Sequence, residues 1–297
     1  MKIDIKISLV FLLLLSLLGG CNGGSNRLKE IKETELLSDS VSLFVSYANT
    51  VFTVPSPQLA NIYLKRLGYY PDRKLLNPLS NIEKYSTTLK KALNFGVLGV
   101  DLGYMNLYSV AENTNDYLNA INKMSVDLGL GTVFTREVHE EIMRLKDQPD
   151  SLAIFLSTLF MKADDYLKIN AQQQTCAIII AGAWVESFYL LCSTYTQYKS
   201  AQVKMVIFQQ KFILENLIKA VAPYYKSSAE IQYFVEQLVE LAYDFDVVEF
   251  KYTYKEPIYR YRKGVMVFFN DVLVPNEESN LGTIIQSASK LRNYIVN

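Results

Sequence analysis

Two carboxylates lie where the surrounding sequence predicts a protein core. Asp101 lies within an apolar, helix-forming stretch from 81 to 111, and Glu186 is the only charged residue between Lys168 and Lys199. A carboxylate inside a core must be ion-paired, hydrogen-bonded several times or protonated. If the two side chains met, they could perform acid–base chemistry of the kind used in glycoside hydrolysis. Spacing does not show that they meet, and two separate carboxylates that fix helix register are the simpler interpretation.

Three aromatic side chains are expected close to these carboxylates. On a helix, Asp101 flanks the face that carries Tyr104 and Tyr108, while Trp184 lies two residues before Glu186. A concave site lined by these groups could hold a small ligand, although Trp184 could equally be an ordinary core residue. The candidate ligand-binding residues are therefore Asp101, Glu186, Trp184, Tyr104 and Tyr108. We predict no catalytic residue, no metal ligand and no cofactor.

His139 is the only histidine of the chain. Its segment lacks the second histidine of a zinc-protease motif, and a single histidine makes a Cys/His zinc site implausible. Glu140 and Arg144 form an i,i+4 pair that is typical of a solvated helix face, so we expect His139 to be solvated. We also place Asp164 and Asp165 on a wet helix surface. No nucleophile elbow of the G-x-S-x-G type is present.

Three glycines lie inside the same predicted helix as Asp101. Gly96, Gly99 and Gly103 fall within an arc of roughly 60° on a helical wheel. Each costs about 1 kcal/mol relative to alanine, so packing has to compensate. Their spacing matches neither the Walker nor the dinucleotide pattern. We therefore predict that another helix packs closely against this stripe.

The composition excludes some classes of protein. The 297 residues are 50% hydrophobic and include 30 basic and 30 acidic side chains. This is too apolar for a fully disordered chain. A net charge of zero supplies no overall attraction to nucleic acid, although a local basic patch is compatible with it.

Helical periodicity dominates the chain after residue 28. Caps and helix breakers divide it into predicted helices over 28–49, 56–68, 81–111, 113–128, 135–148, 150–169, 171–195, 200–221 and 227–243, with a final amphipathic helix from 276. An alternating, tyrosine-rich stretch predicts a small β-hairpin at about 247–269. The fold class that we expect is mostly α: a single bundle-like domain over 28–297, with this hairpin and the final helix at its C-terminal end.

Residues 1–20 have the pattern of a lipoprotein signal peptide. Lys2 and Lys6 precede an apolar run over 7–18, which is too short to span a bilayer. The following Leu-Gly-Gly-Cys sequence ending at Cys21 resembles a bacterial lipobox, so we predict acylation of Cys21, with a short tether over 21–27. A plain signal peptide followed by a coincidental cysteine is the alternative.

The residue after Cys21 and the other cysteines refine this prediction. Asn22 in place of aspartate favours the outer membrane, and the lack of an acidic cluster after Cys21 favours the periplasmic face. Cys176 and Cys192 would lie about 24 Å apart on one helix, too far for a disulfide. We expect both to be free, buried thiols.

The lipobox and two further stretches, 94–102 and 181–186, resemble a group of helical lipoproteins of unknown function from Bacteroidota. The resemblance implies lipid anchoring and a helical fold, and it implies no activity. Imelysin-like proteins are another family of helical envelope lipoproteins, but their histidine-containing metal motif is missing here.

Three functions are compatible with the sequence. The chain could be an envelope-anchored module that binds a protein partner or scaffolds an assembly, with an exposed patch in the tyrosine-rich segment 252–261. It could instead bind a small ligand near Asp101, Trp184 and Glu186, or use the two carboxylates as an enzyme. We expect no nucleic-acid partner, and we expect contact with the membrane through the acyl chains on Cys21.

Overall fold

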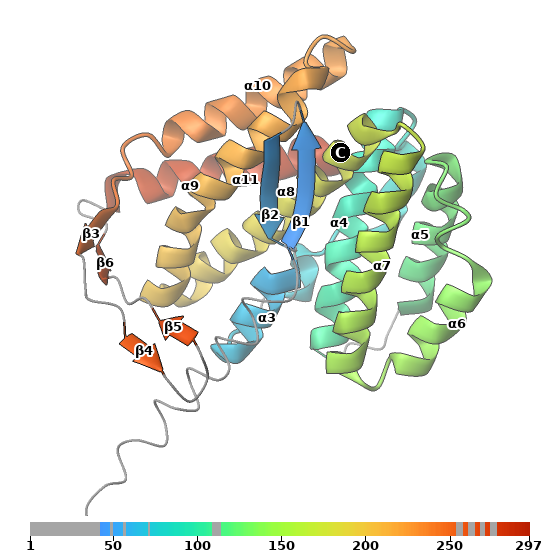
Figure 1. Ribbon diagram of the computed structural model, residues 1–297, viewed down its shortest axis with the longest axis horizontal. Helices are drawn as coiled ribbons and strands as arrows, with labels where there is room; N and C mark the ends of the chain where they lie inside the picture. Colours follow the sequence, from blue (N-terminus) through green and yellow to red (C-terminus); the bar gives the residue numbers. More distant parts are fainter. Residues whose placement is uncertain are drawn as a thin grey trace, which may run out of the picture. The chain divides into compact units, whose positions relative to one another are not determined.

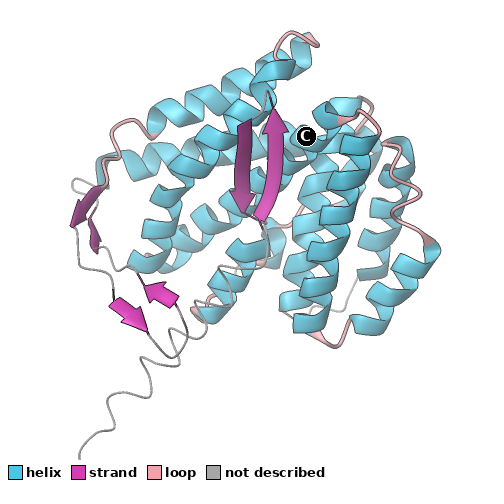
Figure 2. Ribbon diagram, in the orientation of Figure 1, coloured by secondary structure: helices cyan, strands magenta, loops and turns pink. Residues whose placement is uncertain are grey.

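The computed structural model describes residues 42–47, 50–55, 58–70, 72–108, 114–253, 258–260, 265–267, 271–273 and 278–297. The predicted signal peptide over 1–20, Cys21 and the tether over 21–27 lie outside the described residues. In the described part most residues are helical, as predicted (Figure 2).

Two long helices, α4 (Thr88–Leu107) and α8 (Gln173–Tyr198), form the centre of the core. Their backbones touch at glycines. A Cβ atom on Gly96 would lie 2.1 Å from the carbonyl oxygen of Ile179, and one on Gly182 would lie 2.0 Å from that of Leu93. The predicted close packing of another helix is confirmed at Gly96. Gly99 allows a third helix to approach α4, because the absence of a Cβ atom leaves room for the ring of Phe160.

In the ranges that the structure describes, seven further α-helices and three 3-10 turns surround this pair (Figure 1). They are α3 (Gln58–Arg66), η2 (Arg73–Leu75), η3 (Leu79–Lys84), α5 (Thr114–Asp127), α6 (Arg136–Leu145), α7 (Pro149–Ile169), α9 (Ala201–Val221), η4 (Ala222–Tyr224), α10 (Ala229–Asp244) and α11 (Glu278–Val296). Helix α5 contacts α4 and α9 contacts α8, whereas α7 and α11 contact both central helices. Helix α3 contacts both central helices, and α10 packs on α9 and α11.

Short polar side chains set the starts of several helices. The hydroxyl oxygens of Thr135, Ser200 and Ser228 each accept a backbone N–H three residues later, which is the usual N-cap arrangement. Helix α4 begins later than predicted because Thr87 caps it, accepting the N–H of Lys90 at 3.2 Å. The residues before Thr87 form the 3-10 turn η3 instead.

Helix α8 is the one helix in the described ranges that is long and apolar enough to cross a membrane by length and composition. In its most apolar window, 89% of the helix is buried inside the protein. Packing against α4, α9 and α11 therefore accounts for its composition.

The N-terminal end of the described chain differs from the prediction. The sequence predicts a helix over 28–49, but β1 (Ser42–Tyr47) pairs antiparallel with β2 (Thr50–Pro55), with Ser42 opposite Pro55. The two strands are rich in valine, threonine and aromatic residues, which favour a pleated sheet. The helical prediction is therefore wrong for 42–47.

Two short antiparallel pairs lie between α10 and α11. Strand β3 (Lys251–Thr253) pairs with β6 (Asp271–Leu273), and β4 (Ile258–Arg260) pairs with β5 (Val265–Val267). The hairpin predicted at about 247–269 is not confirmed, because much of that segment lies outside the described residues.

Candidate functional site

The contact between α4 and α8 brings Asp101 and Glu186 together. Each lies about one helical turn beyond a glycine of the backbone contact, Gly96 in α4 and Gly182 in α8. Both side chains have no exposed surface, and their carboxyl groups lie within hydrogen-bonding reach of each other. The structure therefore shows that the two carboxyl groups meet, which their positions in the sequence did not show.

Arg292, from α11, is the counter-charge of the pair. Its Nε donates to Glu186 Oε2 at 3.0 Å and its Nη2 to Glu186 Oε1 at 3.3 Å, a two-pronged ion pair inside the core. Nη2 also donates to the carbonyl oxygen of Leu75 at 2.9 Å, and the guanidinium lies over the ring of Tyr189. One positive charge therefore faces two buried carboxyl groups.

Asp101 is the carboxyl group whose surroundings favour the protonated form more strongly. Its Oδ2 accepts the backbone N–H of Asn77 at 3.0 Å, but within the described chain no N–H or hydroxyl donor reaches Oδ1. Burial raises the pKa of Asp101 well above its usual value, and the negative charge of Glu186 raises it further. Burial also raises the pKa of Glu186, against the opposing effect of Arg292. A proton on Asp101 would let this side chain donate to Glu186, and Asp101, Glu186 and Arg292 would then form an electrically neutral cluster.

Asn77 extends this cluster into a larger polar network. Its Nδ2 donates to the hydroxyl of Tyr85 at 2.9 Å and to Asn94 Oδ1 at 3.3 Å, while Tyr117 donates its hydroxyl to the Asn77 carbonyl at 2.8 Å. Burial raises the pKa of Tyr85 to about 12, so this phenol stays protonated and able to donate. The network therefore consists of matched donors and acceptors.

The same network holds the end of the chain. The last carbonyl oxygens of a helix have no partner within the helix. In α11, the carbonyl of Val296 accepts from Tyr85 at 3.2 Å, that of Ile295 from Asn94 Nδ2 at 2.8 Å, and that of Tyr294 from the ammonium of Lys90. Tyr85, which follows η3, and two side chains of α4 thus cap the end of α11.

The candidate aromatic residues are not part of this cluster. Trp184 lies on a different face of α8 from Glu186, because residues two apart on a helix do not face each other. Its Nε1 donates to Gln210 Oε1 on α9 at 3.0 Å, and its ring stacks on Phe188. The structure places Trp184 in the core, away from the carboxyl pair.

Tyr104 and Tyr108 belong to a separate group at the end of α4. Their rings are 4.6 Å apart, and the hydroxyl of Tyr108 donates to the Tyr69 carbonyl at 2.9 Å. Tyr70 packs on Tyr108 with a centroid separation of 5.4 Å, and Tyr69 packs on Tyr198 at 4.8 Å. We call these five residues the tyrosine cluster.

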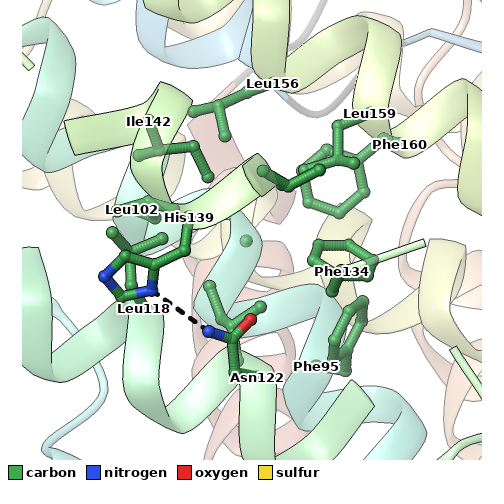
Figure 3. A pocket seen from close by; sticks show the side chains of 13 residues that line it. Phe95, Leu102, Leu118, Asn122, Phe134, His139, Ile142, Leu156, Leu159 and Phe160 are labelled. Carbon is green, nitrogen blue, oxygen red and sulfur yellow. Dashed lines mark hydrogen bonds between the residues drawn. The ribbon is translucent and has the colours of Figure 1, made fainter. Parts of the chain in front are cut away.

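A small apolar cavity lies beside Gly99, between α4, α5, α6 and α7 (Figure 3). Its volume of about 10 Å³ is enough for one water molecule at most. His139 lies at its edge and is half-buried, with one ring nitrogen 3.1 Å from Asn122 Nδ2 and the other 3.1 Å from Asn115 Oδ1. His139 is therefore partly rather than fully solvated, because α5 supplies a partner for each ring nitrogen.

Cys176 and Cys192 are free and buried, as predicted. Burial raises the pKa of both thiols far above the usual value, so neither is a reactive thiolate. The thiol of Cys176 donates to Asp164, which also pairs with Lys168. Asp164 is therefore buried, and its predicted place on a wet surface is wrong.

Sequence reasoning missed Arg292 and Asn77. A signal for Arg292 was available, since it lies four residues after Ala288 on the apolar face of the last helix, where an unpaired charge would be costly. Asn77 lies in a loop, and no periodicity marks it.

Among the described residues, no group of three or more His, Cys, Asp and Glu side chains could hold a metal ion. No protein-family model, curated protein or solved structure matches this chain.

Proposed function

We propose that this chain is a lipoprotein of the bacterial cell envelope, held in the outer membrane by acyl chains on Cys21 and facing the periplasm, and that its helical domain binds another protein. The signal-peptide pattern, the lipobox and the resemblance to helical Bacteroidota lipoproteins support the anchoring. The outward face of α7 supports the binding of a partner.

Helix α7 exposes apolar side chains that no intramolecular contact explains. Ile154 is 70% exposed and Met161, two turns later on the same face, is 39% exposed. They lie beside a surface groove of about 330 Å³, which is lined by Thr132, Val133, Thr135, Val138, Phe155, Thr158, Leu159, Lys162 and Tyr166. Apolar anchors two turns apart beside a groove suit an amphipathic helix or an extended segment of a partner. This surface is the observation that carries the proposal.

The two alternatives have less support. Ligand binding or catalysis at Asp101 and Glu186 requires access to carboxyl groups that have no exposed surface and are occupied by Arg292 and Asn77. Trp184, which would complete a binding site, contacts α9 instead. The tyrosine-rich segment 252–261, where we still expect a hairpin, is a second surface that such a partner could use.

Photo-crosslinking in the native envelope tests the proposal. A photoreactive residue replaces Thr158, which lies between Ile154 and Met161 on α7, and a control probe replaces exposed Thr283 on α11. We expect a discrete adduct from Thr158 only, which the double variant Ile154→Asp, Met161→Asp abolishes without lowering the protein level. Equal adducts from both probes, or an adduct that survives the double variant, would contradict a docking surface on α7.

A further inference from the structure

Basic side chains gather around the tyrosine cluster. Lys65 and Arg66 end α3, Arg73 and Lys74 lie in η2, and Lys199 follows the last residue of α8. Across 58–70, 72–76 and 195–204 there are six basic residues and a single acidic one, Asp72. We call Lys65, Arg66, Arg73, Lys74 and Lys199, together with the tyrosine cluster, the basic tyrosine face.

Direct contacts join two of the three segments that supply this face. The hydroxyl of Tyr198 donates to the Tyr70 carbonyl at 3.2 Å, and the rings of Tyr69 and Tyr198 pack together. The third segment, η2, begins three residues after Tyr70 in the chain. The one carboxylate, Asp72, accepts the backbone N–H of Lys74 at 2.9 Å and so caps η2.

Two tyrosines of this face are exposed at the surface. Tyr70 is 61% exposed and Tyr198 is 39% exposed. Tyrosine is enriched where protein meets a bilayer surface, because its ring is apolar and its hydroxyl is hydrated. Exposed tyrosines among lysines and arginines therefore combine the two side-chain types that suit a lipid headgroup layer.

The opposite charge lies elsewhere on the protein. Residues 227–250, which include α10, contain six carboxylates and no basic residue: Glu230, Glu236, Glu240, Asp244, Asp246 and Glu249. Figure 1 shows α10 at the upper end of the described helices and α3 at the lower end. A net charge of zero thus conceals a separation of charge, and an anionic surface would attract the α3 end and repel the α10 end.

We propose that the basic tyrosine face lies against anionic phospholipid headgroups and orients the helical domain on the membrane. Each lysine or arginine near an anionic bilayer strengthens binding about fivefold. Acyl chains alone would tether the domain without orienting it, whereas this face supplies a second contact. The inference goes beyond protein binding at α7 and does not depend on it. Because the chain has the pattern of an exported protein, an anionic lipid is a better-matched partner than a nucleic acid.

Co-sedimentation with vesicles tests this inference in the mature chain, residues 22–297, made without the acyl group. The vesicles contain phosphatidylcholine alone or with 30% phosphatidylglycerol as an order-of-magnitude match to an anionic leaflet. We expect binding to the anionic vesicles only, and weaker binding as salt shortens the screening length. The triple variant Lys65→Gln, Lys74→Gln, Lys199→Gln should lower the partition coefficient by roughly 100-fold.

A matched triple variant controls for loss of net charge. Lys123, Lys226 and Lys290 are exposed on α5, just before α10, and on α11, and their change to glutamine removes the same total charge. The control variant should change the partition coefficient by less than about fivefold. Equal binding to both vesicle types, or equal losses in the two triple variants, would overturn the proposal. The proposal would also be overturned if the first triple variant lost binding to single-stranded DNA while its binding to vesicles was unchanged. That result would assign the face to nucleic acid.

Discussion

Replacement of Asp101 by asparagine tests the proton assigned to the buried carboxyl pair. An asparagine has the shape of a protonated carboxyl group. Its amide nitrogen can donate to Glu186, and its oxygen can accept the N–H of Asn77 that now reaches Asp101 at 3.0 Å. Asp101→Asn should therefore keep both hydrogen bonds and retain the fold.

The stability of the two proteins should diverge with pH. The pKa of Asp101 is higher in the folded protein than in the unfolded chain, so folding takes up a proton above the unfolded pKa of ~3.9. The free energy of unfolding of the wild type then falls by up to about 1.4 kcal/mol for each pH unit, from ~3.9 to the raised pKa of the folded state. Asp101→Asn removes this dependence and should be at least as stable as the wild type at neutral pH.

Urea unfolding followed by circular dichroism measures this difference at pH values from 4 to 8. Because Asp101 and Glu186 titrate as a pair, we compare the difference in free energy of unfolding between wild type and variant at each pH. A variant less stable than the wild type by more than about 2 kcal/mol at pH 7 would show that Asp101 is ionised in the fold. A difference in free energy of unfolding that stays constant with pH would also refute the assignment of a proton shared by Asp101 and Glu186.

Three further outcomes are expected. Arg292→Gln leaves the Glu186 carboxylate without its counter-charge in the core and should cost about 3–5 kcal/mol in urea unfolding; a loss below 1 kcal/mol would mean that the ion pair is dispensable. Gly182→Ala places a Cβ atom 2.0 Å from a backbone oxygen and should lower the free energy of unfolding by at least about 1–3 kcal/mol. In the control Gly282→Ala, no atom lies within 4 Å of the new Cβ, so stability measured by calorimetry should be unchanged or higher. Cys21→Ala should move the chain from the membrane to the soluble envelope fraction and remove the mass of the acyl chains from its N-terminal peptide. If that peptide showed no loss of acyl mass, lipidation at this residue would be ruled out.

Local rules were enough to predict most of the helices. The starts of α6, α9 and α10 follow from Thr135, Ser200 and Ser228, because an N-cap acts within one helical turn. The stripe of small residues at Gly96 and Gly99 predicted close packing for a similarly local reason. Glycine inside a helix is unfavourable unless the absence of a Cβ atom lets a neighbour approach closely. The failure over 42–47 has the opposite cause, because the pairing of β1 with β2 decided between two local conformations.

The carboxyl pair shows what a sequence alone determines and what needs the fold. That Asp101 and Glu186 are buried follows from the apolar residues around them. That their carboxyl groups meet beside one guanidinium depends on the packing of α4 against α8 and on Arg292, 106 residues after Glu186. Helical periodicity fixes which face a residue occupies on its own helix. The partner of that face is decided by tertiary packing, so the charge balance of this core could be read only from the folded protein.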